Sequence, residues 1–240
     1  MKMKIGSKKY RIPVLAAIMA FGIQAHAEKV DVPEFGNLVV VGDVTVFFTQ
    51  GDYPGYIDVD GSADGITTVW GDTSLVLVMG NNPPKSIRIT ASELSSVTLT
   101  ANTTFISEGE MKGEKLTLTG TDHCTFNVPN ISAEKVAVAL SLESSANIRK
   151  VITEKLSFSV FSNSTAEISG IEAESVAAVS GDNSVMGLIG RCGKKNVVLI
   201  NGGVVNTKGL IEDGATYVHK EAGVRKNDAR NKKEIPVNIP

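Results

Sequence analysis

The sequence predicts an all-β protein: a parallel β-helix with coils of about 20 residues, preceded by an N-terminal region of β-strands. Three observations support this fold. A short phrase returns every 20 residues, apolar and polar residues alternate inside each copy, and clusters of Ser, Asn, Asp and Gly separate the alternating stretches. One repeat of this length cannot bury its own apolar side, so the copies must stack to make a continuous core.

The repeat is clearest between Gly113 and Ser180. Its opening phrase reads GEKLTLTG, AEKVAVAL, TEKLSFSV and AESVAAVS, with a looser copy near Ser95 and a shifted one near Val197. The leucine-rich repeat has a similar length, but its L-x-x-L-x-L pattern is absent. We therefore expect five or six coils over residues 94–218, with each residue about 4.8 Å from its counterpart in the next coil. Apolar residues hold constant slots in these coils: Leu118, Val138, Phe158 and Ala178 in one, and Val128, Ile148, Ile168 and Leu188 in another.

The N-terminal region, residues 28–93, alternates like β-strands but does not keep the period. Alternating stretches such as Val44 to Phe48 and Leu75 to Leu77 are separated by turn-forming sequences, including Gln50-Gly51-Asp52. Because terminal repeats of solenoids are usually atypical, these strands are expected to cap or begin the solenoid.

The two ends of the chain differ from the rest. Residues 1–27 have a basic head, an apolar stretch and a small-residue cleavage signal, which predicts a secretory signal peptide cut between Ala27 and Glu28. The head holds five of the 24 basic residues and no acidic one, so the mature chain has 19 basic and 26 acidic residues, a net charge of about −7. This charge argues against a nucleic-acid partner. Residues 219–240 are basic and poor in apolar residues, which predicts a mobile tail.

The most suggestive polar pattern is a ladder of acidic residues at the start of the repeated phrase. A catalytic or calcium-binding interpretation is weighed against a solvated corner, where neighbouring lysines offset the repulsion between like charges. Acid–base chemistry needs carboxylates in differing environments, and a uniform ladder offers similar ones, so the structural interpretation is favoured. The ladder comprises Glu114, Glu134, Glu154 and Glu174, and the lysines are Lys115, Lys135 and Lys155.

Neither cysteine is expected to be reactive or paired. Cys124 takes the turn slot of Ser144 and its counterparts, whereas Cys192 is assigned to the apolar slot of Ile171 and Ile211, more than three coils away. That separation exceeds the reach of a disulfide. His123 and Cys124 should point to opposite faces of an extended chain, which argues against a catalytic pair. No catalytic residue, cofactor or metal site is predicted, since the sequence has no zinc, P-loop or dinucleotide-binding motif.

A third pattern is a run of outward positions without charge. These residues lie between the inward apolar ones of the repeated phrase, and a flat, small, uncharged face is a candidate surface for contact with another subunit or with the N-terminal strands. An exposed face with no partner remains the alternative. The residues are Thr117, Thr119, Ala137, Ala139, Ser157, Ser159, Ala177 and Val179.

The chain resembles a bacterial family, the putative auto-transporter adhesin, head GIN domain family. The resemblance is carried by the segment from Phe35 to Val46, the Gln50-Gly51 turn, the Thr73 to Leu77 strand and the 20-residue coils with Ile168-Ser169-Gly170-Ile171. It covers nearly all of the mature chain but rests on pattern, and Gly-Ile-Asn triplets are absent. The resemblance implies a right-handed β-helix, trimers and a role in cell adhesion, without an assigned catalytic site.

Together these patterns favour an exported, noncatalytic protein that acts as an adhesin-like head or envelope-interaction module and forms homo-oligomers. The periplasm, the outer-membrane surface and the extracellular space stay open as its location, with contact to the membrane only through the signal peptide. A surface polysaccharide or envelope component is the expected partner. The alternative is a carbohydrate-active β-helix enzyme, a polysaccharide lyase or hydrolase; aromatic residues make up 5% of the chain and Trp70 is the only Trp, which argues against it. A purely structural envelope protein is a third hypothesis.

Overall fold

The computed structural model describes residues 29–51, 55–60, 63–71, 73–212 and 216–220. Apart from one short 3₁₀ turn at Ala63–Gly65, their regular structure is entirely β. The strands are β1 (Lys29–Val32), β2 (Asn37–Val41), β3 (Thr45–Gln50), β4 (Gly55–Asp60), β5 (Ile66–Trp70), β6 (Ser74–Met79), β7 (Ser86–Ala91), β8 (Ser96–Thr100), β9 (Thr104–Ser107), β10 (Glu110–Thr121), β11 (Thr125–Ser141), β12 (Ser145–Val160), β13 (Thr165–Ser180), β14 (Val185–Leu199), β15 (Val204–Glu212) and β16 (Thr216–Lys220).

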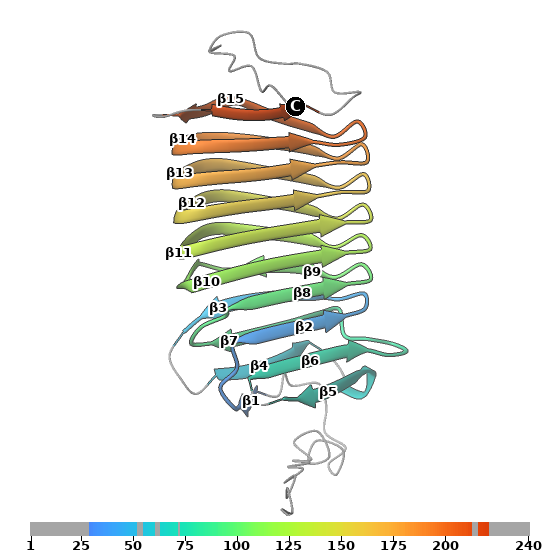
Figure 1. The fold of residues 1–240 in the computed structure, drawn as a ribbon. Helices are drawn as coiled ribbons and strands as arrows, with labels where there is room; N and C mark the ends of the chain where they lie inside the picture. The colour runs from blue at the N-terminus through green and yellow to red at the C-terminus, as the bar shows by residue number, and fades with distance from the viewer. Residues whose placement is uncertain (1–28, 52–54, 61–62, 72, 213–215, 221–240) are drawn as a thin grey trace, which may run out of the picture.

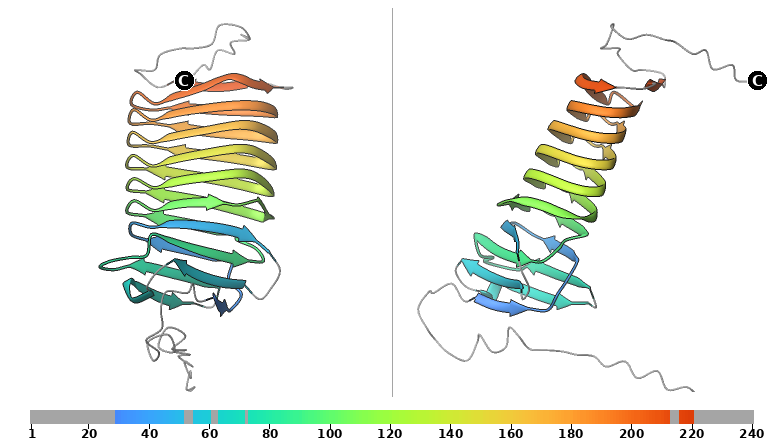
Figure 2. Two further views of the ribbon diagram at one scale, coloured as in Figure 1. Left: turned by 180° about the vertical axis from the view of Figure 1, so that it is seen from behind. Right: turned by 90° about the vertical axis from the view of Figure 1, so that its left-hand side faces the viewer.

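The strands form a flattened solenoid with two layers, which confirms the predicted fold class. We call the layer of β6, β2, β8 and the second halves of β10 to β14 the front sheet, and the layer of β7, β3, β9, the first halves of β11 to β14 and β15 the rear sheet (Figure 1). The long strands bend from the rear sheet into the front sheet, and the coils wind with a right hand (Figures 1 and 2). Val138 lies beside Phe158 and Ile148 beside Ile168 in parallel register, so the 20-residue period is the length of one coil.

The core lies between the two sheets and is built from stacked columns of apolar side chains. Leu118, Val138, Phe158 and Ala178 follow one another in register and are all buried. In the lower coils the rings of Phe48 and Phe105 stack with a centroid separation of 5.8 Å, and the Phe126 ring lies tilted against Phe105 with a centroid separation of 6.0 Å. Alternation along each strand thus sends one set of side chains into a continuous core and leaves the other set on the surface.

In six successive coils, the chain turns from the front sheet to the rear sheet through two residues with positive φ. These pairs are Ala101-Asn102, Asp122-His123, Leu142-Glu143, Ser162-Asn163, Asp182-Asn183 and Asn201-Gly202. Asn and Asp tolerate this left-handed conformation better than Ala or Leu does. Backbone hydrogen bonds join successive turns, such as the 2.9 Å bond that the His123 N–H donates to the Leu142 carbonyl. The turns therefore stack with the same spacing as the strands.

A buried polar ladder holds the inner side of these turns. The Cys124 N–H donates to Ser144 Oγ, the Ser144 N–H to Ser164 Oγ and the Ser164 N–H to Ser184 Oγ, each over 3.1 Å. Ser144 Oγ also donates to the Ser141 carbonyl over 2.7 Å. The prediction that Cys124 shares a slot with these serines is confirmed. Cys124 and Cys192 are both buried, and no disulfide joins them. Burial raises the pKa of the Cys124 thiol, so that cysteine is poorly reactive.

The N-terminal strands join the same stack, but in an order that differs from the sequence. Asn37 in β2 pairs with Ser74 in β6 on one side and with Ser96 in β8 on the other, both in parallel register. The coil made by β2 and β3 therefore lies between the coil of β6 and β7 and that of β8 and β9. Beyond them, β1 and β4 pair antiparallel, as do β5 and β6. The 20-residue period is absent here because neighbouring coils are far apart in sequence.

The assignment of Cys192 to the slot of Ile171 and Ile211 is wrong. Cys192 lies opposite Ala173, and Ile171 instead lies opposite Gly190, which adopts φ +145° at an irregularity in the register. The side chain of Ile211 is 58% exposed. The chain shortens this coil by one residue at Gly190, whereas the assignment of Cys192 had assumed one residue more than the period, so the inferred phase was two residues out.

Several predictions concern parts that the structure does not describe. The signal peptide and its cleavage site at Ala27 and Glu28 lie outside the described residues, as do residues 221–240 of the predicted tail. Strand β16 reaches Lys220, so it includes the first two residues of that tail. In the described part of the chain, no helix is long and apolar enough to cross a membrane.

Replacing Ser144 by Ala should destabilise the protein by about 1–3 kcal/mol, because the buried Cys124 N–H loses its acceptor. Urea unfolding monitored by circular dichroism measures this change. The matched control is Ser145→Ala, which removes a hydroxyl from a half-buried outward position whose bond to Thr125 is not buried in the core. Equal losses in the two variants would contradict the proposed importance of the inner ladder.

Leu142→Asn should instead stabilise the protein, by about 0.5–1 kcal/mol. Leu142 has φ +53° and is 52% exposed, so Asn relieves backbone strain and sacrifices little buried apolar surface. The same unfolding measurement applies. Leu142→Ala keeps a Cβ in the strained conformation and should gain much less; an equal gain would show that strain is not the cause.

Candidate binding surface

The eight predicted interface residues come together on the outside of the front sheet. Thr117, Ala137, Ser157 and Ala177 form one column across four coils, and Thr119, Ala139, Ser159 and Val179 form the next. Ser157, Ser159 and Ala177 are exposed, and the others are half-buried by their neighbours. Regular strand alternation places them there, since the intervening residues point into the core.

The uncharged surface extends further than the repeat predicted. Both columns continue through β8, β2 and β6 and also into β14. The sequence did contain a signal for this extension, because Val, Thr, Ser and Asn alternate at the outward positions of these strands. The order in which the strands stack could not be predicted from the sequence. We define the uncharged face as the column Ser74, Asn37, Ser96, Thr117, Ala137, Ser157, Ala177 and Asn196 together with the column Val76, Val39, Thr98, Thr119, Ala139, Ser159, Val179 and Val198.

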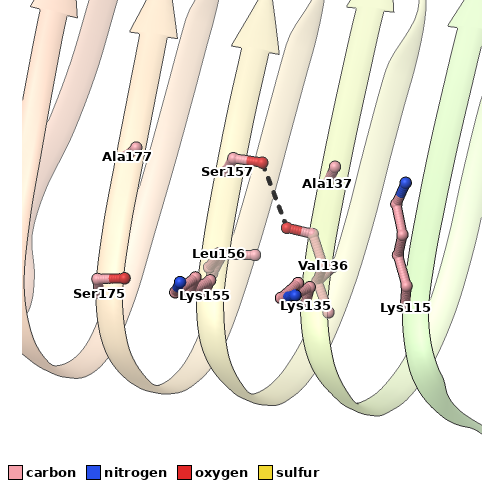
Figure 3. A pocket seen from close by; sticks show the side chains of 9 residues that line it. All are labelled: Lys115, Lys135, Val136, Ala137, Lys155, Leu156, Ser157, Ser175 and Ala177. Carbon is pink, nitrogen blue, oxygen red and sulfur yellow. Dashed lines mark hydrogen bonds between the residues drawn. The ribbon is translucent and has the colours of Figure 1, made fainter.

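Polar groups on this face are partly satisfied within the sheet. Ser96 Oγ donates to Asn37 Oδ1 over 2.7 Å, and Asn37 Nδ2 donates to Ser74 Oγ over 3.4 Å. Ser157 Oγ donates to the Val136 carbonyl over 3.4 Å, as Figure 3 shows. Covering these groups therefore costs less than covering free hydroxyls and amides.

A shallow groove of about 390 Å³ borders the uncharged face at the start of its strands. Lysine side chains line it on three consecutive coils, Ser175 takes the same position on the fourth, and Ala137, Ser157 and Ala177 lie beside them (Figure 3). Lys115, Lys135, Lys155 and Ser175 are in register, and Lys194 follows on β14. We call Lys115, Lys135 and Lys155 the lysine row.

The predicted glutamate ladder lies at the corner just before the lysine row, and its four side chains are exposed. Within the described residues, none of these carboxylates forms an ion pair of 4.0 Å or less with the lysine row. The lysines therefore do not offset the ladder through direct contacts. No group of three or more His, Cys, Asp or Glu residues in the described ranges is placed to hold a metal ion.

Arginine and carboxylate groups meet on the rear sheet, away from the groove. Arg88 Nη1 lies 2.6 Å from Glu108 Oε1, and the guanidinium carbon lies 4.8 Å from the centre of the Phe47 ring. Thr49 Oγ1 donates to the other oxygen of Glu108 over 3.0 Å. The hydrogen bond from Arg88 lowers the pKa of Glu108 and raises that of Arg88. A general acid of a glycosidase needs a raised carboxyl pKa, so this cluster does not favour an enzyme.

His123 occupies an exposed turn and does not pair with Cys124. Its Nδ1 lies 3.0 Å from Asp122 Oδ1, and its Nε2 lies 3.2 Å from Glu143 Oε2 in the next coil. The Cys124 thiol points inward and lies 3.0 Å from the Thr121 carbonyl oxygen. The expected opposite orientation of the two residues is present. The hydrogen bond to Asp122, together with the charge of Glu143, raises the pKa of His123.

The same fold occurs in solved structures of bacterial proteins. A putative adhesin from Parabacteroides merdae ATCC 43184 matches with a TM-score of 0.60 and 16% identity, over 81% of this chain and 96% of that one. A putative adhesin from Parabacteroides distasonis ATCC 8503 gives 0.63 and 12% over the same shares. A putative lipid binding protein from that strain gives 0.59 and 12%, again over 81% and 96%. No family model and no curated protein matches this chain. Identities this low show a shared fold, and the GIN-domain resemblance stays a prediction.

The raised pKa of His123 should depend more strongly on Asp122 than on Glu143, because the hydrogen bond to Asp122 is its largest cause. NMR titration should give a pKa above 6.5 in the folded protein, a larger fall in Asp122→Asn and a smaller one in Glu143→Gln. Because the folded-state pKa is raised, the contribution of this contact to stability is full below the unfolded pKa and is lost as pH rises through the folded value. Asn tolerates positive φ, so Asp122→Asn should keep the turn. An unchanged pKa in both variants would contradict the assignment.

Proposed function

We propose that the protein is a noncatalytic, exported, adhesin-like module that self-associates through the uncharged face. The observation that carries this proposal is the absence of charge across both columns of the face, which span eight coils. Charged residues are depleted at the centres of protein interfaces because their desolvation is costly. The rear sheet has the same strand geometry but carries outward charged residues such as Arg88, Arg149 and Glu167.

The dimensions of the face suit an interface. Eight coils at about 4.8 Å and strands of about five residues give a surface of roughly 34 by 17 Å, or about 600 Å². A standard interface buries about 800 Å² on each partner, so the face supplies most of this area. Its small and β-branched side chains present little rotamer entropy to lose on contact.

The adhesin-like part of the proposal is supported by the fold shared with proteins named as adhesins. Export is supported by the signal-peptide pattern of residues 1–27, which leaves the periplasm, the outer-membrane surface and the extracellular space as destinations. The carbohydrate-active alternative has no comparable support, since none of the described residues that line the groove carries a carboxylate that could act as a general acid.

Light scattering on residues 28–240 tests self-association. We expect the wild type to be a homo-oligomer, with a trimer as the state implied by the family resemblance, and Ala137→Glu/Ala177→Glu to be a monomer because two carboxylates enter the face. Asn127→Glu/Asn147→Glu is the matched control. It adds the same charge at register-paired outward positions of the rear sheet and should remain oligomeric.

Circular dichroism should confirm that all three proteins keep their β-structure. A monomeric wild type, or equal dissociation of the two variants, would overturn the proposed interface.

A further inference from the structure

The lysine row is a line of cations without ion-pair partners. Lys112 pairs with Glu110 over 3.0 Å, and Lys150 pairs with Glu172 over 3.2 Å. Among the described residues, no such contact of 4.0 Å or less involves Lys115, Lys135 or Lys155, although each follows a glutamate in the chain. These three exposed ammonium groups stay available to a ligand.

The bend of each coil explains why the two charged ladders separate. Leu116 and Leu118 point into the core, so Lys115, Thr117 and Thr119 share the outward side of the front sheet. Glu114 precedes this alternation and projects from the corner, where an inward position of the sheet no longer exists. Stacking repeats this arrangement on successive coils. Positive charge therefore borders the front sheet, while negative charge runs along the corner beside it.

The groove has a definite direction. Its lysines lie on successive coils, about 4.8 Å apart, so the row runs along the solenoid axis and across the strands. The apolar stems of the lysines provide an uncharged surface for the body of a ligand at the border of the uncharged face (Figure 3). A rod-shaped molecule with one anion per repeating unit fits this surface better than a compact ligand does.

We propose that this groove binds a linear acidic polysaccharide that carries carboxylates on successive sugar units. Lysine supplies point charges, which suit carboxylates that repeat along a polymer. Single-stranded nucleic acid is a poorer match because the groove contains no aromatic side chain on which bases could stack. This inference rests on the proposed adhesin-like function and names its partner class, but it does not require self-association. In an oligomer the lysine row would lie at the rim of the uncharged face, where polar residues are usual.

Binding of polygalacturonate to residues 28–240, measured by calorimetry, tests the proposal. Lys115→Gln/Lys135→Gln/Lys155→Gln should weaken binding at least about tenfold, because three surface charge contacts are lost. Lys112→Gln/Lys150→Gln/Lys208→Gln removes the same charge elsewhere and should change affinity less than about twofold. Affinity should also fall between about 0.05 M and about 0.15 M salt. Equal losses in the two variants, or no binding by the wild type, would overturn the site.

Two further polymers test the ligand class. Dextran has no charge and should not bind. Polyglutamate carries repeating carboxylates without sugars, and binding as tight as that of polygalacturonate would overturn the assignment to a polysaccharide.

Light scattering on the same variants separates this proposal from self-association. The variant of the lysine row should keep the oligomeric state of the wild type, since its substitutions lie at the rim. A monomeric wild type with lysine-dependent polygalacturonate binding would support the binding groove and overturn the self-association interface. An oligomer that does not bind polygalacturonate would support the interface and overturn the binding groove.

Discussion

The structure depends on one constraint, the parallel register that sets each residue beside its counterpart one coil away. Ladder hydrogen bonds fix this register over the length of β11 to β14, and every side-chain column follows from it. The serine ladder under the turns needs coils of equal length, because each hydroxyl must meet the backbone N–H of the neighbouring coil. Where the coil between Ile171 and Gly190 loses a residue, a glycine with φ +145° absorbs the change, and parallel register resumes at that glycine, opposite Ile171.

The same register gathers like charges into rows, which costs stability in an ordinary sheet. Here the bend of the coil places the two kinds of charge in separate rows. Glutamates project from the corner, lysines border the front sheet, and both rows are exposed to water, where the repulsion is screened. The solenoid thereby converts a two-residue Glu-Lys phrase into two separate lines of charge. A globular fold of the same composition would scatter these groups.

Sequence reasoning succeeded where neighbouring coils are neighbouring repeats of equal length. The period located the columns of Leu118 and Cys124 and the eight outward residues, because one interval governs all of them. It failed for β2, whose neighbours in β6 and β8 lie far along the chain, and for Cys192, which follows the shortened coil at Gly190. The sequence also did not reveal that the glutamates and lysines, which are neighbours in the chain, form two separate rows in space. That separation depends on where each coil bends. Leu142 breaks the residue preference of its turn, so tertiary stacking must hold its backbone conformation.

A stable solenoid does not require an uncharged front sheet. Outward positions on the rear sheet carry Arg149, Lys150 and Glu167 without interrupting the ladders of β12 and β13. The inward side chains and the backbone bonds hold both sheets, so outward residues are free to vary in charge with little effect on the fold. The fold therefore does not require the absence of charge from the uncharged face, and the proposed contact with a partner would account for it. The lysine row borders that face along the solenoid axis and places positive charge beside the proposed contact surface.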